Sequence, residues 1–391
     1  MREFCFKGSI SASKSLFNRV LIAKSYHSKL QILGSTNCDD VTRLQKSLNQ
    51  IKNKKVFNCG EGGTTLRFLA FRLSREKGNF VLKGSSRLLA RPQLEIKNIL
   101  SQLGVEVCVN KTNIRIISNG WVVPAKAVVV NAKDSSQFLS ALFLNSWDLD
   151  FDLKVKVVDG ATSQSYLHMT LALLNQLGLR YQKRGSSYIV PKGQKVKAKT
   201  CRVESDMSSI FSVAAFGALF GQAEFLDFPN SKMQPDEQFL KFFKKMNVPV
   251  KLNSRVCTVK AARQLRSLRA NLQNCPDLFP VLAIVCAFAE GRSILYGAPQ
   301  LKVKESNRIE KIAELLTRAG FGCHPRGDGM EIVGQQNIAL EKKFEFDPDS
   351  DHRLAMAAAI LKYKGFKIKI KNPSVVKKSF PEFWSLVGVK P

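Results

Sequence analysis

A short polar cluster near the N-terminus has the residue types that bind anions. It consists of Lys14, Ser15 and Arg19. If this segment is helical, Ser15 and Arg19 are i,i+4 neighbours on one face. A hydroxyl, an ammonium and a guanidinium placed together suit a phosphate or a carboxylate. A solvated helix end explains the same three residues, so the cluster alone leaves both interpretations open.

A second cluster, Lys304-Glu305-Ser306-Asn307-Arg308, adds a carboxyl group to two cations. On a helix, Lys304 and Arg308 share a face, with Glu305 displaced by about 100°. A carboxyl between two cations can donate or accept a proton while the cations hold a phosphate. A surface network of salt bridges is the alternative.

Other polar segments are individually weaker. The turn 60–67 is glycine-rich but lacks the Lys-Ser/Thr ending of a Walker loop. Two hydroxyls and an amide at 135–137, and the pair Ser163 and Tyr166, could equally be helix caps. Asp351-His352 suggests a Ser–His–Asp triad, but the chain has no G-x-S-x-G elbow, which argues against acyl transfer.

These side chains fall where a polar or glycine-rich turn is followed by a helix-like apolar run, a pattern that occurs six times. Strand-like, β-branched stretches such as 153–158 and 367–370 lie between the runs. The alternation predicts an α/β protein with six similar units. Free N–H groups at several helix starts would trap an anion if the starts converged. The six starts are at Ser13, Glu61, Asp134, Ser205, Cys275 and Asp349.

Length and composition are those of a globular protein. The chain has 391 residues, 45% of them hydrophobic and 24% charged, which predicts two or three domains at roughly 150 residues each and excludes disorder. The nine cysteines form no C-x-x-C pair, so neither a disulfide framework nor a zinc site is indicated, and we expect buried thiols in a reducing compartment.

The net charge of +30 is large. Nucleic acid, an anionic surface and small polyanionic substrates are candidate causes, and a lysine-rich lineage composition is a fourth. The N-terminus has no apolar signal core, and the longest uncharged stretch, 207–223, is shorter than the ~20 residues of a membrane span. We expect a buried core helix there, and a soluble, cytoplasmic protein with no membrane partner.

Taken in order, the segments resemble the family of 5-enolpyruvylshikimate-3-phosphate (EPSP) synthases. K-E-S-x-R together with D-H-R-x-A-M is very specific, and the resemblance spans nearly the whole chain. The motifs are S-K-S-x-x-N-R (Ser13–Arg19), G-T-x-x-R (Gly63–Arg67), R-P (Arg91-Pro92), S-S-Q-F (Ser135–Phe138), D-x-S-S (Asp206–Ser209), P-D (Pro276-Asp277), K-E-S-x-R (Lys304–Arg308), D-H-R-x-A-M (Asp351–Met356) and K-S-F-P-x-F (Lys378–Phe383).

The resemblance implies a two-domain inside-out α/β barrel, with six βαβαββ units arranged three per domain. Residues 1–12 and 205–391 would form one discontinuous domain and residues 13–204 the other, with the active site in the interdomain cleft. The resemblance also implies a monomer that needs neither a metal nor another cofactor.

The implied reaction transfers the enolpyruvyl group of phosphoenolpyruvate to the 5-hydroxyl of shikimate 3-phosphate, through a tetrahedral intermediate that loses phosphate. The implied catalytic groups are Asp277 as base, Glu305 as acid and Lys14 as a further proton carrier. The residues implied to bind shikimate 3-phosphate are Lys14, Ser15, Arg19, Ser135, Ser136, Gln137, Ser163, Tyr166, Asp277, Gln300 and Lys304. Those implied to bind phosphoenolpyruvate are Lys14, Gly63, Arg91, Gln137, Arg308, Arg353 and Lys378.

Several positions depart from the family pattern. Glu61 replaces an Asn and Phe68 a Pro, and both departures bear on phosphoenolpyruvate affinity and on sensitivity to glyphosate, the family's herbicide competitor. Ser11-Ala12 replaces Pro-Gly, Gln300 replaces Asn, and Pro235 replaces the Gly of a Q-G-D turn.

Three other functions compete with this one. UDP-N-acetylglucosamine enolpyruvyl transferases share the fold and donor, but they usually carry Lys-Asn in place of Lys14-Ser15 and lack K-E-S-x-R. A basic nucleic-acid-binding protein fits the charge, yet no stacking platform or nucleic-acid module appears, so no nucleic-acid partner is expected. A decayed enzyme is disfavoured because the implied catalytic side chains are present.

Overall fold

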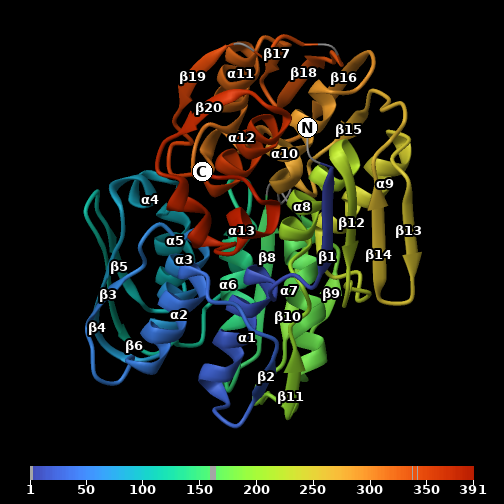
Figure 1. Ribbon diagram of the computed structural model, residues 1–391. Coiled ribbons are helices and arrows are strands. Elements are labelled where there is room, and N and C mark those ends of the chain that lie inside the picture. The colour runs from blue at the N-terminus through green and yellow to red at the C-terminus, as the bar shows by residue number, and fades with distance from the viewer. Residues whose placement is uncertain (1–2, 159–163, 337, 341) are drawn as a thin grey trace. The chain divides into compact units, whose positions relative to one another are not determined.

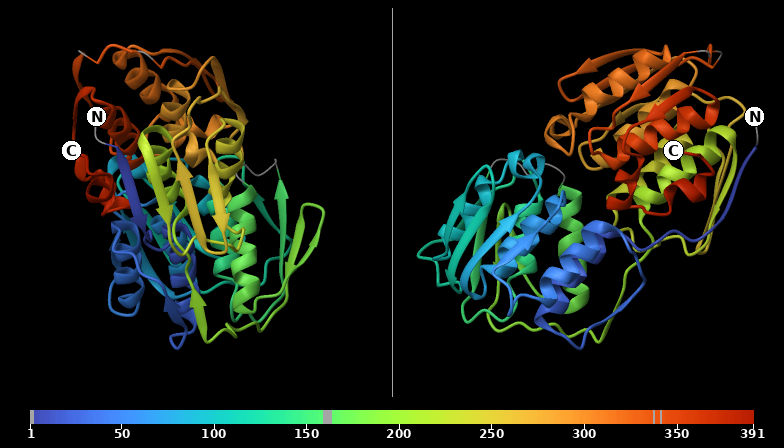
Figure 2. Two further views of the ribbon diagram at one scale, coloured as in Figure 1. Left: turned by 45° about the vertical axis from the view of Figure 1, so that its right-hand side comes forward. Right: turned by 60° about the vertical axis from the view of Figure 1, so that its left-hand side comes forward.

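A computed structural model describes residues 3–158, 164–336, 338–340 and 342–391 (Figures 1 and 2). The chain divides into two compact units, which we call unit 1 (Met1–Ser11 and Glu204–Pro391) and unit 2 (Ala12–Val203). Each unit has its own hydrophobic core. Figure 1 labels the helices and strands, and its colours show where each lies in the sequence.

The described part of unit 1 contains two four-stranded sheets and one two-stranded sheet. The first has the spatial order β1 (Phe4–Gly8), β12 (Gly221–Phe225), β14 (Val256–Lys260) and β13 (Val250–Asn253). The second has the order β15 (Arg269–Asn271), β16 (Arg292–Tyr296), β18 (Gly329–Val333) and β17 (Gly322–Arg326). The third pairs β19 (Lys343–Phe346) with β20 (Lys367–Ile370).

The sheets of unit 2 repeat this set within its described residues. One has the order β3 (Val56–Asn58), β4 (Lys77–Lys83), β6 (Ile114–Asn119) and β5 (Glu106–Val109). Another has the order β7 (Val128–Asn131), β8 (Leu153–Val158), β10 (Ser187–Val190) and β9 (Gln182–Arg184). The last pairs β2 (Gln31–Leu33) with β11 (Thr200–Arg202).

Every four-stranded sheet follows one pattern: a parallel pair, then two antiparallel pairings. In the first sheet of unit 1, β1 is parallel to β12 with Phe4 opposite Gly221, and β14 is antiparallel to both β12 and β13. A parallel pair needs a crossover, which a helix supplies. The prediction of an α/β protein with interleaved strands and helices is therefore confirmed. The two-stranded sheets contain only the parallel pair, so the sheets of each unit are not equal in size.

Three helices in each unit are buried over most of their length, which identifies them as inner helices. Most of their buried side chains are apolar or small, as is typical of a helix enclosed in a core, and the buried polar ones include Arg19, Arg67 and Arg353. In unit 2 they are α1 (Lys14–Tyr26), α3 (Gly63–Leu73) and α6 (Gln137–Leu144). In unit 1 they are α8 (Met207–Phe220), α10 (Phe279–Ala287) and α12 (His352–Lys364).

All six predicted helix starts precede these inner helices, and the side chains of Ser13, Asp206 and Asp351 accept hydrogen bonds from the first turns. The predicted core helix at 207–223 is confirmed as far as Phe220; the chain then enters β12 at Gly221. Within the described residues, no helix is both long enough and apolar enough to cross a membrane.

The remaining helices pack outside the inner ones. In unit 2 they are α2 (Asp39–Asn49), α4 (Ser86–Ala90), α5 (Leu94–Ser101) and α7 (Gln164–Leu177). In unit 1 they are α9 (Phe239–Lys245), α11 (Arg308–Ala319) and α13 (Phe383–Val387), with the 3-10 helices η1 (Pro235–Gln238), η2 (Pro276–Leu278), η3 (Pro299–Val303) and η4 (Pro373–Lys378).

The cysteines are less uniformly buried than the sequence predicts. All nine are free thiols. Cys5 and Cys108 are exposed on the edge strands β1 and β5, and Cys323, on the edge strand β17, is half-buried with its Sγ against the backbone carbonyl of Ala313. Burial raises the pKa of Cys59 to about 12, so this thiol is inert at neutral pH. Among the described residues, no group of three or more His, Cys, Asp or Glu side chains could hold a metal ion.

Candidate active site

The first predicted cluster lies at the start of α1 in unit 2. Ser13 caps the helix, and the next residue, Lys14, places its Nζ 3.0 Å from Oδ2 of Asp40 in the first turn of α2. Asp40 is 4% exposed, and its backbone oxygen accepts a hydrogen bond from Thr65 of α3. This pair fixes the ammonium group where three helices meet, so Lys14 is held in place before any ligand binds.

The guanidinium of Arg67 joins the starts of α3 and α6. It is 2% exposed and donates from Nη1 to Oγ of Ser135 (3.1 Å) and Oε1 of Gln137 (2.9 Å). Its Nε donates to Oε1 of Gln93 at 3.1 Å, and its Nη2 to the carbonyl of Pro92 at 2.8 Å. Ser135 and Gln137, both predicted to bind substrate, are thus brought together and oriented by one buried cation.

The glycine-rich turn lies beside the same residues. Nε2 of Gln137 donates to Oγ1 of Thr64 at 3.2 Å, which ties α6 to the start of α3. A Cβ at Gly63 would lie 2.7 Å from Nη1 of Arg91, which is closer than real Cβ contacts come. Gly63 therefore leaves room for the Arg91 guanidinium against the helix start, and these two predicted phosphoenolpyruvate residues are neighbours.

Arg19 is more deeply embedded than a surface anion-binding residue. It is 2% exposed; its Nε donates to Oγ1 of Thr170 at 2.7 Å, and its other nitrogens donate to the backbone carbonyls of Ser15 (2.7 Å) and Tyr166 (3.3 Å). Burial lowers its pKa to about 10, so it stays charged at neutral pH. Arg19 ties the first turn of α1 to the first turn of α7 and carries positive charge to that point.

The other predicted residues of unit 2 differ in accessibility. Ser15 and Tyr166 are half-buried, and Ser136 is 4% exposed, with a side chain that makes no cap hydrogen bond. Ser163 lies outside the described residues.

The polar cluster of unit 1 is built around Asp277 in η2. Its Oδ1 lies 2.8 Å from Nη1 of Arg308 and 3.6 Å from Nζ of Lys304, and its Oδ2 lies 3.0 Å from Nη2 of Arg353. Burial disfavours the charged carboxylate, but Arg353, Lys304 and Arg308 outweigh that effect and hold the pKa of Asp277 well below its ordinary value. Asp277 is therefore ionised, as a proton acceptor must be.

Arg308 links the two carboxyl groups that were predicted to move protons. It is 1% exposed and donates to Asp277, to Oε2 of Glu305 at 3.0 Å and to Oδ2 of Asp351 at 2.7 Å. Burial alone would lower the pKa of Arg308, but the three carboxylates raise it well above its ordinary value. Asp351 also accepts from Ser306 and caps α12, so it fixes both Arg308 and the helix that carries Arg353.

The last predicted cation, Lys378 at the end of η4, completes this cluster. Its Nζ lies 3.5 Å from Oε1 of Glu305, and the residue is 6% exposed. Glu305 thus stands between Lys378 on one carboxylate oxygen and Arg308 on the other. The cations of this cluster are placed where they could hold an anion next to two ionisable carboxyl groups.

A second buried carboxyl group approaches Arg353. Asp236 of η1 accepts a very short hydrogen bond from Ser208, whose Oγ in turn accepts from Nη2 of Arg353 at 3.1 Å. Burial raises the pKa of Asp236 to about 6, and the negative charge of Asp277 adds to this effect. Arg353 therefore contacts one carboxylate directly and a second, more easily protonated one through a serine.

The expectation that Lys304, Glu305 and Arg308 share one helix is wrong. Lys304 follows the 3-10 helix η3, and α11 begins only at Arg308, with Asn307 as its N-cap. The intervening residues are not helical because Asn307 caps the next helix through its side chain, which accepts from the backbone of Glu310. All three side chains still meet at Asp277 or beside it. Gln300, within η3, is 7% exposed and donates to the carbonyl of Gln273 at 3.4 Å.

Two of the sequence departures have distinct positions. Glu61 is half-buried in the turn that precedes α3. Phe68 is fully buried, and its ring lies 5.3 Å from the guanidinium carbon of Arg19. Phe68 is thus a core residue that contacts the guanidinium of Arg19.

Sequence analysis assigned no role to Asp40, Gln93 or Asp236, which position Lys14, Arg67 and Arg353. One signal was available for Asp40. The buried residues of α2 include Asp40, Val41 and Leu44, so an acidic residue falls on the apolar stripe of an amphipathic helix, where a partner is required.

Comparison with known proteins gives a consistent result. The model of a protein family described as "EPSP synthase (3-phosphoshikimate 1-carboxyvinyltransferase)" matches residues 9–386. A 3-phosphoshikimate 1-carboxyvinyltransferase from Syntrophobacter fumaroxidans is 32% identical over 83% of this chain and 77% of its own. One from Pyrococcus furiosus is 29% identical over 97% of this chain and 91% of its own.

Solved structures share the fold at lower identity. The EPSP synthase of Acinetobacter baumannii superposes with a TM-score of 0.76 at 21% identity, covering 99% of this chain and 95% of that one. The enolpyruvyl transferase NikO from Streptomyces tendae superposes with a TM-score of 0.72 at 11% identity, covering 98% of this chain and 94% of that one. The chain, with its two units of small sheets, therefore has the fold of these enolpyruvyl transferases.

Proposed function

The chain belongs to the EPSP synthase family of 3-phosphoshikimate 1-carboxyvinyltransferases, and on that premise we propose which of its side chains bind the substrates and move the protons. Its reaction transfers the enolpyruvyl group of phosphoenolpyruvate to the 5-hydroxyl of shikimate 3-phosphate and releases phosphate, a step of the shikimate pathway to aromatic amino acids. The substrates are polyanions, which matches clusters built around buried arginines and lysines.

Shikimate 3-phosphate binds mainly to unit 2. Lys14, oriented by Asp40, and the pair Ser135 and Gln137, oriented by Arg67, supply an ammonium, a hydroxyl and an amide. Ser15, Arg19, Ser136, Ser163 and Tyr166 complete the contacts from this unit, and Asp277, Gln300 and Lys304 supply those from unit 1. The support is that the described members of the unit 2 set lie at the starts of α1, α6 and α7.

Phosphoenolpyruvate binds mainly to the cations of unit 1. Arg308, Arg353 and Lys378 converge on two carboxyl groups, and an arginine fork suits both carboxylate and phosphate. Lys14, Gly63, Arg91 and Gln137 complete the set from unit 2, where Gly63 keeps space open for Arg91.

Asp277 acts as the general base. It takes the proton of the 5-hydroxyl as that oxygen attacks C2 of phosphoenolpyruvate. Its three cationic neighbours make it a weak base, since a low pKa reduces the driving force for proton transfer. Anionic substrates attract Arg308, Arg353 and Lys304. The interaction of these cations with Asp277 then weakens, and the basicity of Asp277 increases.

Glu305 acts as the general acid. It gives its proton to C3 of phosphoenolpyruvate, which becomes a methyl group in the tetrahedral intermediate. The Glu305 carboxylate then takes a proton back from the methyl group as the C2–O bond to phosphate breaks, which restores the double bond. Arg308 and Lys378 favour the carboxylate form of Glu305, so an anion that engages both cations makes protonation of Glu305 easier. Lys14 carries a further proton and neutralises phosphate charge.

The finer architecture follows from the same family. We infer an inside-out α/β barrel of six βαβαββ units, three per domain, with the substrates in an interdomain cleft whose closure expels water. The support is that, in each unit, proposed substrate-binding side chains lie at the starts of inner helices, as Lys14 does in α1 and Arg353 in α12. We also infer a cytoplasmic monomer that works without a metal or other cofactor and without nucleic-acid or membrane partners.

The observation that carries the assignment is Arg308, a buried cation bonded to both proposed proton-transfer groups. The test is release of inorganic phosphate from phosphoenolpyruvate, measured with shikimate 3-phosphate and, as a control acceptor, with UDP-N-acetylglucosamine. We expect release only with shikimate 3-phosphate. Release only with the sugar nucleotide would contradict the acceptor, and release by neither would contradict the activity.

The residue roles need their own variants. Glu305→Gln keeps the size of the side chain, and its amide oxygen can accept from either Arg308 or Lys378, but it cannot protonate carbon, so we expect turnover to fall by about 10²–10⁴. Glu310→Gln, on the exposed first turn of α11, is the matched control and should leave turnover unchanged. Near-normal turnover of the Glu305 variant would contradict the assignment of the acid.

A further inference from the structure

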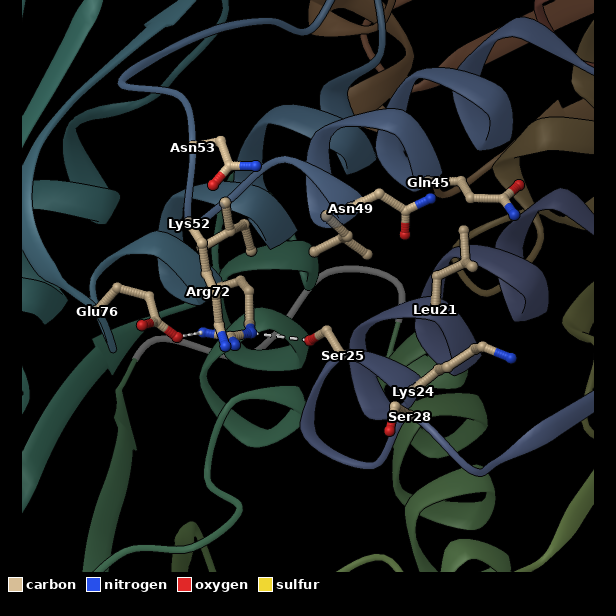
Figure 3. A pocket seen from close by; sticks show the side chains of 12 residues that line it. Leu21, Lys24, Ser25, Ser28, Gln45, Asn49, Lys52, Asn53, Arg72 and Glu76 are labelled. Atoms are coloured by element: carbon tan, nitrogen blue, oxygen red, sulfur yellow. Dashed lines mark hydrogen bonds and ion pairs between the residues drawn. The ribbon is translucent and has the colours of Figure 1, made fainter.

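Unit 2 contains a cavity of about 360 Å³ that the reaction does not use. Figure 3 shows the side chains that surround it, from α1, α2, the turn that follows α2, and the end of α3. The lining residues are Leu21, Lys24, Ser25, Ser28, Gln45, Leu48, Asn49, Ile51, Lys52, Asn53, Arg72 and Glu76.

The cavity combines an apolar floor with a fixed guanidinium. Leu21 and Ile51 are buried and Leu48 is partly buried, and together they supply the apolar surface. Arg72 is 7% exposed; its Nε donates to Oγ of Ser25 at 2.8 Å and its Nη1 to Oε1 of Glu76 at 2.6 Å, both drawn as dashed lines in Figure 3. The buried Arg72 is therefore held in one orientation inside a cavity that is open to solvent.

Two lysines give the lining an excess of positive charge. Nζ of Lys24 donates to the carbonyl of Leu30 at 2.8 Å, and no ion pair within the described chain compensates its charge. Lys52 is exposed, and no hydrogen bond or ion pair joins it to another described residue. Because Arg72 is neutralised by Glu76, Lys24 and Lys52 are left to attract an anion.

We propose that this cavity is a second ligand site, which binds a small molecule with an apolar body and one carboxylate. Its volume lies at the lower end of the range typical of small-molecule sites, which are mostly apolar with a few fixed polar groups. The body rests on Leu21, Leu48 and Ile51, and the carboxylate lies at Lys52. The amides of Gln45, Asn49 and Asn53 form the polar rim.

The site is connected to the proposed substrate cluster by three helices. The cavity is lined by residues toward the C-terminal ends of α1, α2 and α3, while the N-terminal parts of the same helices carry Lys14, Asp40 and Arg67. These helices contact one another directly. A ligand that changes their spacing in the cavity therefore changes the position of the Lys14–Asp40 pair. By linkage, occupancy of one site changes affinity at the other by the same factor.

The binding half of this proposal goes beyond the proposed function, while the coupling half rests on it. The test of binding is a titration of the deuterated, 15N-labelled full chain with 3-phenylpropionate, followed by amide chemical shifts. We expect saturable shifts at residues 21–28, 45–53 and 72–76. The uncharged isostere 3-phenylpropanamide should bind at least about tenfold more weakly, because it lacks the negative charge that Lys52 attracts.

Matched charge variants locate the carboxylate. Lys52→Gln should weaken 3-phenylpropionate about five- to tenfold. Lys46→Gln removes the same charge from the exposed face of α2, outside the cavity lining, and should leave the affinity unchanged. Both side chains are exposed, so neither variant should impair folding, and the thermal midpoint of each verifies this.

Several outcomes would overturn the proposal. Binding is contradicted if no saturable shift occurs up to the solubility limit of the probe, or if the shifts are confined to residues 14–19, 63–67 and 135–137. The position of the carboxylate is contradicted if the acid and the amide bind with equal affinity, or if Lys52→Gln binds the probe as tightly as wild type does. Coupling is tested by repeating the titration at saturating shikimate 3-phosphate, where a change in probe affinity of at least about twofold is expected. An unchanged affinity would refute coupling. Failure of shikimate 3-phosphate to shift residues 14–19 would contradict the proposed function and leave the cavity titration standing.

Discussion

Arg67 of unit 2 and Arg308 of unit 1, two buried arginines within the polar clusters, have opposite kinds of partner. In unit 2, Arg67 donates to Gln93, Ser135 and Gln137, which are uncharged. In unit 1, Arg308 donates to Asp277, Glu305 and Asp351, which are carboxylates. The same side chain is therefore used once within a network of neutral acceptors and once within a network of charges.

The difference between these two networks indicates how substrate recognition and proton transfer are divided between them. A cluster of neutral acceptors does not titrate near neutral pH, so it keeps its geometry and suits recognition. A cluster of coupled charges responds to every added anion and every transferred proton, which suits proton transfer at a reacting centre. We therefore expect substitutions of the carboxyl groups around Arg308 to lower turnover and substitutions within the Arg67 network to weaken binding.

The largest test of this division is Asp277→Asn. The amide keeps the size of the side chain but cannot accept the 5-hydroxyl proton, so kcat should fall by about 10²–10⁴. Steady-state phosphate release measures it, with Asp328→Asn on the loop between β17 and β18 as a control outside the cluster. A fall in binding alone, with kcat preserved, would erase the difference between the two units.

A smaller effect is expected from Arg67→Lys in unit 2. A lysine cannot reach the several acceptors of the guanidinium, so Ser135 and Gln137 lose their shared donor. The KM for shikimate 3-phosphate should rise about tenfold or more, while kcat at saturation changes less. Arg75→Lys is the control: Arg75 follows the same helix and donates to the carbonyls of Asn145 and Trp147. A selective loss of kcat in the Arg67 variant would contradict a positioning role.

The sequence predicted the helix starts better than the partners that orient them. Ser13 and Asp351 cap helices through residues two or three positions away, and such local contacts leave a pattern in the sequence. Asp40 meets Lys14 across 26 residues, and Gln93 meets Arg67 across 26 as well. Those contacts depend on how helices pack, which residue types and spacing do not encode locally.

The family motifs named the reacting groups, but not the state in which the fold holds them. The helical face expected for Lys304 and Arg308 fails because Asn307 starts a new helix between them. The low pKa of Asp277 and the raised pKa of Asp236 arise from burial and from neighbours in other segments. Burial and long-range charge are properties of the packed unit, so a linear pattern cannot supply them.

The two carboxyl groups beside Arg353 should respond to pH with opposite signs. The pKa of Asp236 is raised to about 6, so the folded protein holds this proton more tightly than the unfolded chain, and stability falls as pH rises from about 4 to 6. Asp236→Asn should therefore raise stability at pH 7, by on the order of 1–3 kcal/mol. The pKa of Asp277 is lowered, so its carboxylate stabilises the fold above its ordinary pKa, and this contribution is lost as pH falls.

Thermal unfolding midpoints of the two Asn variants, measured between about pH 2 and pH 8, check these signs. Asp277→Asn should be less stable than wild type at pH 7 and approach it in acid, whereas Asp236→Asn should show its advantage only near neutral pH. Two variants that shift stability in the same direction at every pH would show that the carboxylates do not differ in charge state.

The smallest expected effect sharpens the comparison from the side of unit 2. In Gly63→Ala, the new Cβ would meet Nη1 of Arg91 at 2.7 Å, so the flexible guanidinium must move by a fraction of an ångström. Because a displaced contact removes binding energy without removing a proton donor or acceptor, the KM for phosphoenolpyruvate should rise about threefold, with kcat nearly unchanged. Gly327→Ala, where a Cβ meets no atom within 4 Å, should match wild type. The rise should also be equal at every pH at which the enzyme is active, because the displaced contact involves no carboxyl group. A rise that tracked the titration of a carboxyl group would place Gly63 in the charge network around Arg308 rather than in the Arg67 network.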